Sequence, residues 1–400
     1  MRYYVNCSKG GLPVKRIFLL FLAAALLLTL AGCVGPQSRK DTRDPGTDGP
    51  TASSPTPEDA DNTPVRILNT QPALQQTWQT LAAEYTELTG IQAKVVTSEA
   101  DDPTLRSIAS AEELPETCAD LSQTNACAQL ISQELTLTDE TGGVLAVANS
   151  LEVYGLMYNS TLLAQTANTR EDINSFTDLT EVVYGISDAK DALGFSAFAR
   201  VDSDGYFVLR LAALSGSCRN LVELILNNTT LDLSELENRT KQDALKDFVE
   251  GKAVFFLAGS AEQNVLSAIG TENIGVLPIY TGGENEENQT LCIAPRSYWC
   301  VDAAGDEARA TVDFLDFLTT PRANGTVPVD DLQCMTPYRH AGYASNPAEV
   351  VLRRDLAAGK KPVVCRYVTT VPPELGDVLA AYAADPSDDN WAAVCQYLNE

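Results

Sequence analysis

Apolar residues along the chain follow two spacings, and their order predicts secondary structure. Residues 65–68 form a short β-branched and apolar run that is typical of a strand. Between Pro72 and Gly90, apolar residues then recur at helical spacing. These positions are Leu74, Trp78, Leu81, Tyr85 and Leu88. Residues 91–96 read as a second strand, so the order predicts a βαβ unit and an α/β fold with a parallel sheet.

Strand and helix patterns alternate nearly to the C-terminus. Residues 244–251 read as the end of a helix, and residues 253–258 and 274–277 as strands. Helix patterns follow at 308–318, 347–358, 373–384 and 388–398. No internal repeat of 20–50 residues is visible, which argues against a solenoid or a propeller. Residues 65–400 exceed the usual ceiling for one hydrophobic core, so two lobes are expected.

The N-terminal segment has the layout of a secretory signal peptide. The first 16 residues carry four basic residues and no acidic residue, and residues 17–31 are apolar except for Thr29. This run is shorter than the roughly 20 apolar residues that a spanning helix needs. The alternative is one uncleaved membrane helix that extends through Gly35.

The residues Leu30-Ala31-Gly32-Cys33 resemble the bacterial lipobox, in which the cysteine thiol takes the lipid. We therefore expect residues 1–32 to be a lipoprotein signal peptide and Cys33 to be the acylated first residue of the mature chain. Two or three acyl chains, at about 0.8 kcal/mol per buried methylene, would give stable anchoring. The predicted location is the extracytoplasmic face of the cell membrane.

Residues 33–64 are predicted to be a flexible tether. They are rich in Pro, Gly, Ser, Thr and Asp, and they cannot bury enough apolar surface to offset the entropy of ordering. Loss of residues 1–32 would remove four basic residues and no acidic ones, and would change the formal net charge from −26 to −30. Such a surface repels nucleic acid, so no nucleic-acid partner is expected.

The chain has ten cysteines, of which Cys7 would leave with the signal peptide and Cys33 would carry the lipid. In an oxidising compartment the other eight favour disulfides over metal binding, because no CxxC or Cys-His spacing occurs. One choice among 105 possible connectivities pairs Cys118 with Cys127, Cys292 with Cys300, Cys365 with Cys395, and Cys218 with Cys334.

No motif supports catalysis. The single histidine, His340, lies in a loop-like stretch without a GxSxG elbow or a metal-ligand spacing, and it is interpreted as a surface residue. The run at 202–205 begins like a calcium loop, but Ala213 stands where such a loop needs Glu. Nucleotide and zinc-protease motifs are absent from the sequence. We therefore predict no enzyme, no cofactor and no metal site.

Six segments occur in an order that is typical of a known family. They are LEVYGLMYN at 151–159 followed by Leu162-Leu163, FTDL at 176–179, FVEGKAVFFLAGS at 248–260, GVLPIY at 275–280, Tyr298-Trp299, and the helix pattern at 308–320. Together they resemble the extracellular solute-binding proteins of carbohydrate ABC transporters, the family that includes maltose-binding protein. The resemblance spans about residues 65–400.

This resemblance implies two α/β lobes joined by a hinge, with a ligand cleft between them. Lobe one would comprise residues 65–147 plus 255–322, and lobe two residues 148–254 plus 323–400. The lobes would close on a carbohydrate, and permease subunits of an ABC importer in the membrane would read the closed form. The expected state is a monomer.

Sugars offer apolar C–H faces and hydroxyl rims, so their sites combine aromatic platforms with polar partners. On this basis Tyr154, Tyr298 and Trp299 are the predicted platforms, and Glu152 and Arg296 the predicted polar partners. The alternative function is a surface interaction lipoprotein that keeps the bilobal fold and has no sugar ligand. It predicts aromatic residues buried as core and a filled cleft.

Overall fold

The computed structural model describes residues 64–199, 218–229, 240–262, 267–342, 346–365, 367, 372 and 374–398. The predicted signal peptide, the tether with Cys33, and the run at 202–205 lie outside the described residues. All described residues belong to one compact unit, Pro57–Glu400.

The predicted βαβ unit is present at the start of the described chain. It consists of β1 (Val65–Leu68), α2 (Gln75–Thr89) and β2 (Ala93–Val96), and the two strands pair in parallel. α2 ends because Gly90 takes a φ of 76°, a left-handed conformation that glycine adopts without strain. Its buried face carries Trp78, Leu81, Ala82 and Tyr85. The α/β fold class is therefore confirmed.

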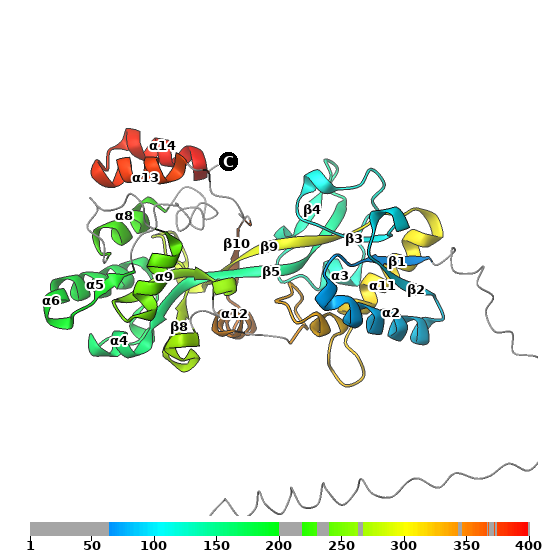
Figure 1. Ribbon diagram of the computed structural model, residues 1–400, viewed down its shortest axis with the longest axis horizontal. Helices are drawn as coiled ribbons and strands as arrows, with labels where there is room; N and C mark the ends of the chain where they lie inside the picture. The colour runs from blue at the N-terminus through cyan, green and yellow to red at the C-terminus, as the bar shows by residue number, and fades with distance from the viewer. Residues whose placement is uncertain are drawn as a thin grey trace, which may run out of the picture. The chain divides into compact units, whose positions relative to one another are not determined.

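The other helices and strands follow in chain order (Figure 1). They are β3 (Leu105–Ile108), α3 (Asn125–Ala128), β4 (Thr136–Thr138), β5 (Val144–Asn159), α4 (Ser160–Gln165), α5 (Phe176–Asp188), α6 (Lys190–Leu193), β6 (Ser196–Phe198), α8 (Arg219–Asn227), α9 (Lys241–Val249), β7 (Ala253–Gly259), β8 (Ile274–Leu277), β9 (Gln289–Val301), α11 (Gly305–Thr319), α12 (Pro347–Ala357), β10 (Lys361–Val364), α13 (Glu374–Ala384) and α14 (Asp388–Leu398). The elements predicted from 244 onwards are all present, with ends shifted by a few residues at most.

Two long strands, β5 and β9, form the middle of the sheet (Figure 1). The sheet order is β2-β1-β3-β9-β5-β7-β6, and β9 pairs antiparallel with both β3 and β5. β5 has 16 residues, so it pairs with β4 near its start and with β7 and β8 near its end. β5 and β9 therefore connect the βαβ unit to the strands that follow α4.

The pairing of β5 with β9 is irregular in its middle. Ser150 lies opposite Ser297, but the next residue, Leu151, lies opposite Pro295. Proline cannot donate a ladder hydrogen bond. The Leu151 N–H bonds outside the β5–β9 ladder and donates to the Met335 carbonyl at 2.8 Å. Such bulges turn side chains out of the regular alternation.

Two large apolar clusters pack on the sheet. The first contains the buried faces of α2 and α11, where Tyr85 and Phe314 meet edge to face at 5.1 Å, and it continues to α9 and α12. The second contains apolar residues of α5, α8, α13 and α14. Residues along β5 alternate between them: Val153 belongs to the first cluster and Tyr154 to the second.

The division into two lobes stays a prediction. The strands β7 and β8 lie almost entirely in the range 255–322, which the predicted division assigned to lobe one. Both strands pair with residues 154–159 of β5, and β7 also pairs with β6.

One of the four predicted cysteine pairs is excluded by the structure. Cys292 and Cys300 are both on β9, and at about 3.3 Å per residue their Cα atoms lie roughly 26 Å apart, too far for a disulfide. That pairing is wrong. The other three pairs stay predictions, and the eight described cysteines are free thiols in this structure.

Candidate functional site

A cavity of about 590 Å³ opens beside the irregular part of the β5–β9 pairing. This volume is in the range of small-molecule sites. Its walls come from the ends of β1 and β3, the start of α2, the middle of β5 and β9, and the segment after the 3₁₀ turn η12 (Pro328–Leu332). The lining residues used below are Asn69, Gln71, Trp78, Ser107, Asn149, Ser150, Arg296, Ser297, Trp299, Gln333, Cys334 and Tyr367.

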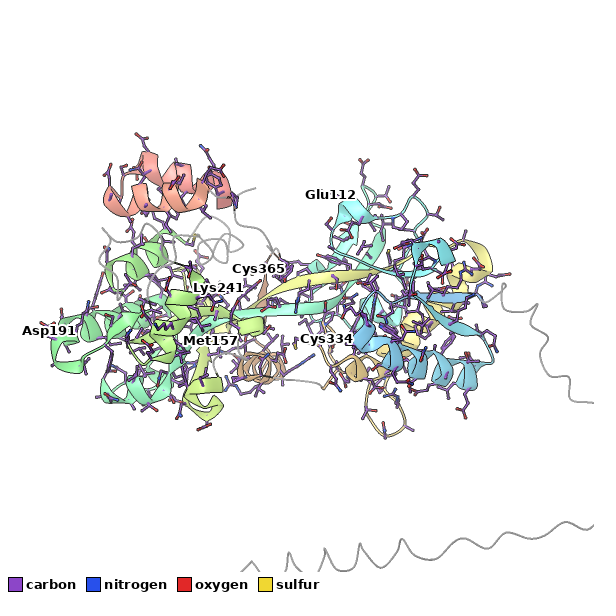
Figure 2. The ribbon with its side chains drawn as sticks, in the orientation of Figure 1. Glu112, Met157, Asp191, Lys241, Cys334 and Cys365 are labelled. Atoms are coloured by element: carbon purple, nitrogen blue, oxygen red, sulfur yellow. The ribbon has the colours of Figure 1, made fainter. Side chains whose placement is uncertain are left out.

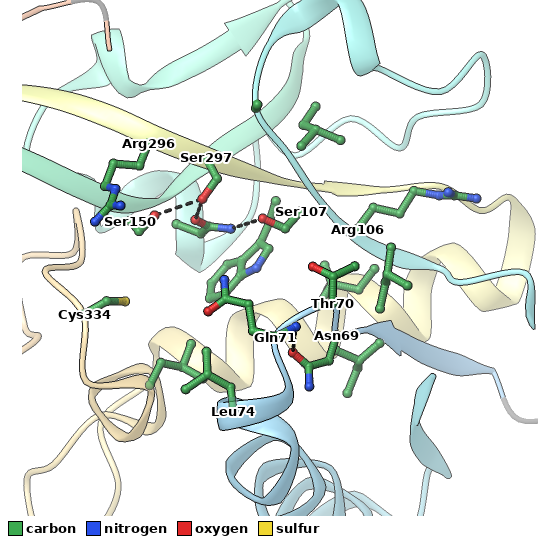
Figure 3. Close-up of a pocket in the computed structure, with 18 of the residues that line it drawn as sticks. Asn69, Thr70, Gln71, Leu74, Arg106, Ser107, Ser150, Arg296, Ser297 and Cys334 are labelled. Atoms are coloured by element: carbon green, nitrogen blue, oxygen red, sulfur yellow. Dashed lines mark hydrogen bonds between the residues drawn. The ribbon is translucent and has the colours of Figure 1, made fainter. Parts of the chain in front are cut away.

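A chain of neutral polar side chains crosses three strands along one wall (Figure 3). The Asn149 amide donates to Ser107 Oγ at 3.0 Å and accepts from Ser297 Oγ at 2.5 Å. The Ser297 and Ser150 hydroxyls are 2.9 Å apart. Asn149 is only 7% exposed, so these bonds satisfy a polar group that burial would otherwise penalise.

The turn after β1 contributes a second polar edge. β1 ends at Leu68, and Asn69 Oδ1 accepts from the Gln71 N–H at 3.0 Å, while its amide donates to Gln75 Oε1 at 2.8 Å. Pro72 then begins the turn into α2. These bonds use the Gln71 backbone and leave its exposed side chain at the cavity.

Arg296 brings the one charged group of β9 to the cavity. Its side chain is about half exposed and lies 3.8 Å from the buried carboxylate of Glu152. Its guanidinium also lies over the Tyr367 ring, 5.7 Å from the centroid. A buried carboxylate and an aromatic face therefore hold the guanidinium between them.

The indole of Trp299 forms the apolar base of the cavity. It is 4% exposed and packs edge to face on Trp78 at 6.0 Å and stacked on Tyr338 at 6.4 Å. The Tyr338 hydroxyl donates to the Ala148 carbonyl at 3.0 Å. Burial raises the pKa of Tyr338 well above its usual range, which keeps this hydroxyl a donor.

Gln333 and Cys334 complete the wall opposite the strands. Gln333 has a φ of 54°, an uncommon conformation for a residue with a side chain, and such positions cluster at functional sites. Burial raises the pKa of the Cys334 thiol to about 11, and nearby Glu349 adds to the shift. Cys334 therefore contributes a neutral thiol at physiological pH.

The cavity contains two of the five residues predicted to bind ligand. Trp299 and Arg296 line it. Tyr154 is 7% exposed and belongs to the second apolar cluster, and Tyr298 packs against Ile108, Ala146 and Cys300. Glu152 is buried and reaches the cavity only through Arg296.

The neutral amides and hydroxyls were missed by the sequence analysis. Asn149-Ser150 directly follows the apolar start of the 16-residue strand β5, and this polar pair is the signal that could have found them. Ser297 follows Pro295 by two residues in a second long strand. A polar side chain in the interior of a buried strand needs a hydrogen-bond partner, and β5 and β9 supply such partners to each other.

The described part of the chain contains no cluster of side chains that could hold a metal ion and no helix that could span a membrane. His340 is exposed, as predicted. No group of three or more His, Cys, Asp or Glu side chains there is placed to hold a metal ion. None of the described helices has the length and apolar character needed to cross a membrane.

Comparison with known proteins identifies the family. Residues 60–326 match the model of the bacterial extracellular solute-binding protein family. No curated protein matches the chain.

Three solved structures with the same fold are similar to this chain over 84% of its length. Apo RafE from Streptococcus pneumoniae is 14% identical, with 97% of that chain covered and a TM-score of 0.61. The bacterial solute receptor AcbH is 12% identical, with 97% covered and a TM-score of 0.58. A family 1 protein from Bifidobacterium longum subsp. infantis is 12% identical, with 98% covered and a TM-score of 0.57. The family match covers more than half of the chain, and this chain therefore belongs to the bacterial extracellular solute-binding proteins.

Proposed function

We propose that this chain is a lipid-anchored receptor that captures a carbohydrate and delivers it to an ABC importer. In this proposal Cys33 holds the chain at the extracytoplasmic face of the cell membrane. The carbohydrate occupies the cavity beside the β5–β9 bulge, and no chemistry is done on it.

The observation that carries the proposal is the make-up of the cavity wall. Neutral amides and hydroxyls form a connected group along the strands, from Ser107 through Asn149 to Ser297, between apolar residues and two arginines. Gln71 and Gln333 add amides from other segments of the lining. Such groups both donate and accept, so they match sugar hydroxyls, which do the same. The Trp299 indole lines the cavity but is only 4% exposed, so it contributes apolar lining and not an open platform for a sugar ring.

The similar structures support the same class of ligand. A RafE structure was solved in complex with raffinose, at a TM-score of 0.51 and 14% identity. AcbH has an exclusive substrate preference for β-D-galactopyranose. We carry over only the class, carbohydrate, because the identities are low.

The test is thermal unfolding of the mature chain with a panel of mono- and oligosaccharides. A sugar that binds the folded state must raise the midpoint of unfolding. Gln71→Ala removes an exposed cavity side chain, and the loss of one hydrogen bond should weaken sugar binding roughly 5- to 10-fold.

Gln76→Ala is the matched control, because Gln76 is also exposed and lies on α2 outside the cavity lining. It should leave binding unchanged. If no sugar at millimolar concentration raises the midpoint, the carbohydrate proposal fails.

One observation favours the alternative of a surface interaction lipoprotein. Tyr154 and Trp299 are buried, as that alternative predicts for the aromatic residues. The open cavity of about 590 Å³ speaks against it, because the alternative predicts a filled cleft. A pulldown that recovers a protein partner from a chain with no sugar response would support it.

A further inference from the structure

Cys118 and Cys300 meet on the face of β9 that points away from the first apolar cluster. Trp299 and Val301 belong to that cluster, so Cys300 between them faces the other way. There Cys300 packs in a small cluster with Cys118. The Ala119 N–H donates to the Val301 carbonyl at 3.0 Å and fixes the backbone beside the two thiols.

Cys218 and Cys395 meet where α8 docks on the C-terminal helices. Arg219, the first residue of α8, donates to Asp388 at the start of α14 at 2.6 Å and lies 5.9 Å from the centroid of the Trp391 ring. Cys218 directly precedes Arg219 in sequence. Cys395 lies one helical turn after Trp391. Cys218 is buried in the second apolar cluster, and Cys395 packs against the same cluster.

Cys292 and Cys365 meet on the parallel pair of β9 and β10. Val363 lies opposite Cys292, and the Cys365 N–H donates to the Ile293 carbonyl at 2.7 Å. Figure 2 marks Cys365 at the end of β10. Both cysteines are buried in the second apolar cluster.

The remaining two described cysteines have other neighbours. The Cys127 thiol contacts Gln133 Oε1 at 3.8 Å, and Cys334 lines the cavity. Within the described part of the chain, neither of these two sulfurs has a cysteine partner.

We propose that the exported protein carries three disulfides, Cys118–Cys300, Cys218–Cys395 and Cys292–Cys365, and that Cys127 and Cys334 stay thiols. Each bridge joins segments that are at least 70 residues apart in sequence. Closing such long loops restricts the unfolded chain most. The proposal rests on an extracytoplasmic location, where disulfides persist, and not on the identity of the ligand.

The oxidant is a disulfide of the glutathione or thiol oxidoreductase class. The Cys118 thiolate attacks one sulfur of oxidised glutathione, forms a mixed disulfide and releases one glutathione. Cys300 then attacks the Cys118 sulfur and releases the second glutathione, and the two cysteine protons end on the two released thiols. Two protein thiols and one oxidised glutathione thus become one protein disulfide and two reduced glutathiones.

Burial sets the order in which the bridges form. Cys118 and Cys395 are partly exposed, whereas Cys292 and Cys365 are buried. Burial raises the pKa of Cys300 to about 12 and that of Cys218 to about 11, so their exposed partners make the first attack. The Cys292–Cys365 bridge forms while the chain folds, because the folded protein shields both sulfurs.

Peptide mapping tests the connectivity. The full chain is recovered from the outer side of the membrane, alkylated with N-ethylmaleimide without reduction, digested and analysed by mass spectrometry. We expect three cross-linked peptide pairs that disappear on reduction, and alkylated Cys127 and Cys334. An alkylated member of any of the three pairs, or a linkage between other cysteines, overturns the proposal.

A refolding experiment tests whether the fold itself permits the three bridges, independently of where the protein is located. The reduced, denatured chain is refolded in a glutathione redox buffer, where the same three linkages should form. If they form there but are absent from the protein recovered from the outer side of the membrane, the fold permits the bridges but the proposal fails.

Mutant stability gives an independent readout. Reduction should lower the melting temperature of the oxidised wild type by several degrees. Cys218→Ser, Cys395→Ser and the double variant should each lose the same part of this redox-dependent shift, because either change removes the whole bridge. Cys127→Ser is the control and should keep the full shift. Additive losses from the two single variants would overturn this bridge.

Discussion

At the scale of single residues, the cavity depends on a few neutral side chains that satisfy one another. Asn149 lies between Ser107 and Ser297 on neighbouring strands, and its amide uses both of its polar ends within the protein. The hydroxyl of Ser150 extends the chain by one member. Preorganised hydroxyls of this kind keep donor and acceptor capacity for a ligand without the entropy cost of ordering long side chains.

We expect Ser297→Ala to lower the free energy of unfolding by roughly 1–3 kcal/mol, since it leaves the buried Asn149 carbonyl oxygen without its donor. Urea unfolding of Ser297→Ala, Ser107→Ala and the double variant measures this. The two single effects should not add, because both hydroxyls bond the same amide. Strict additivity would show that the hydrogen-bonded chain does not act as a unit.

Gln333 provides a second test at this scale, because its left-handed backbone is unfavourable for any residue with a Cβ. Gln333→Ala and Gln333→Gly both remove the amide, but only glycine relaxes the backbone. The glycine variant should therefore be more stable than the alanine variant by about 1 kcal/mol, as measured by urea unfolding. Equal stability of the two would contradict the idea of a strained position.

The residues that line the cavity were the part of the site that was hardest to predict from sequence. Trp299 and Arg296 were predicted and line the cavity, but Tyr154 packs in the core. Aromatic residues stand out in a sequence whether they bind or pack, because burial is their commonest use. Ser107 carries no such signal, since serine is common at any surface. Its role depends on a contact with Asn149, 42 positions away, which no local pattern encodes.

At the scale of elements, local periodicity predicted β1, α2, β2 and the elements from α9 onwards except β9 and β10, and it left the elements between β2 and α9 unpredicted. α2 was foreseen from its apolar spacing and its terminal glycine, and β7 from an apolar run. The full lengths of β5 and β9 were not foreseen, because each continues through a bulge and Pro295 ends the simple strand pattern of β9. The predicted Cys292–Cys300 pair was wrong for a related reason: the two cysteines are close in sequence, but both lie on the extended strand β9, which keeps them apart.

The contact between α11 and α3 gives a pH-dependent test. The Asp316 carboxylate accepts from the Ala126 N–H at 3.1 Å, and burial raises the pKa of Asp316 above its usual range. The folded state therefore disfavours the charged form. Above the pKa of Asp316 in the folded protein, this penalty lowers the free energy of unfolding. As the pH falls, the folded protein takes up the proton before the unfolded chain does, and the penalty disappears.

Asp316→Asn should therefore stabilise the protein at pH 7, and its advantage should shrink as the pH approaches 4. Thermal unfolding of the variant and the wild type across this pH range measures the difference. Asp306→Asn, on the exposed first turn of the same helix, is the matched control and should show no such pH-dependent gain. A constant difference for Asp316→Asn at all pH values would refute the explanation by burial.

At the scale of the whole molecule, family membership and the long strands suggest how binding is reported. β5 and β9 run from the βαβ unit to β7 and β8, and the bulge at Ser150 lies between these two regions. If the predicted lobes move about this bulge, a bound sugar should reduce the radius of gyration measured by small-angle X-ray scattering. An unchanged radius with saturating sugar would show that binding does not require closure.

The anchor is the remaining whole-molecule prediction, and two cysteines make it testable. Cys33→Ser should abolish incorporation of a clickable palmitate and leave a precursor that keeps residues 1–32, because the residue that takes the lipid is gone. Cys7→Ser is the matched control: Cys7 lies in the basic start of the predicted signal, so lipid labelling and processing should continue. Intact mass and in-gel fluorescence give both readouts.

Lipid label retained by Cys33→Ser, or lost in Cys7→Ser, would refute the assignment of Cys33. The consequence reaches beyond localisation. A chain of 31 flexible residues spans on the order of 30 Å between its ends, from about 5–6 Å times the square root of its length. With Cys33 as the anchor, residues 34–64 would keep the solute-binding body close enough to a permease for each capture event to be followed by delivery at a high effective concentration.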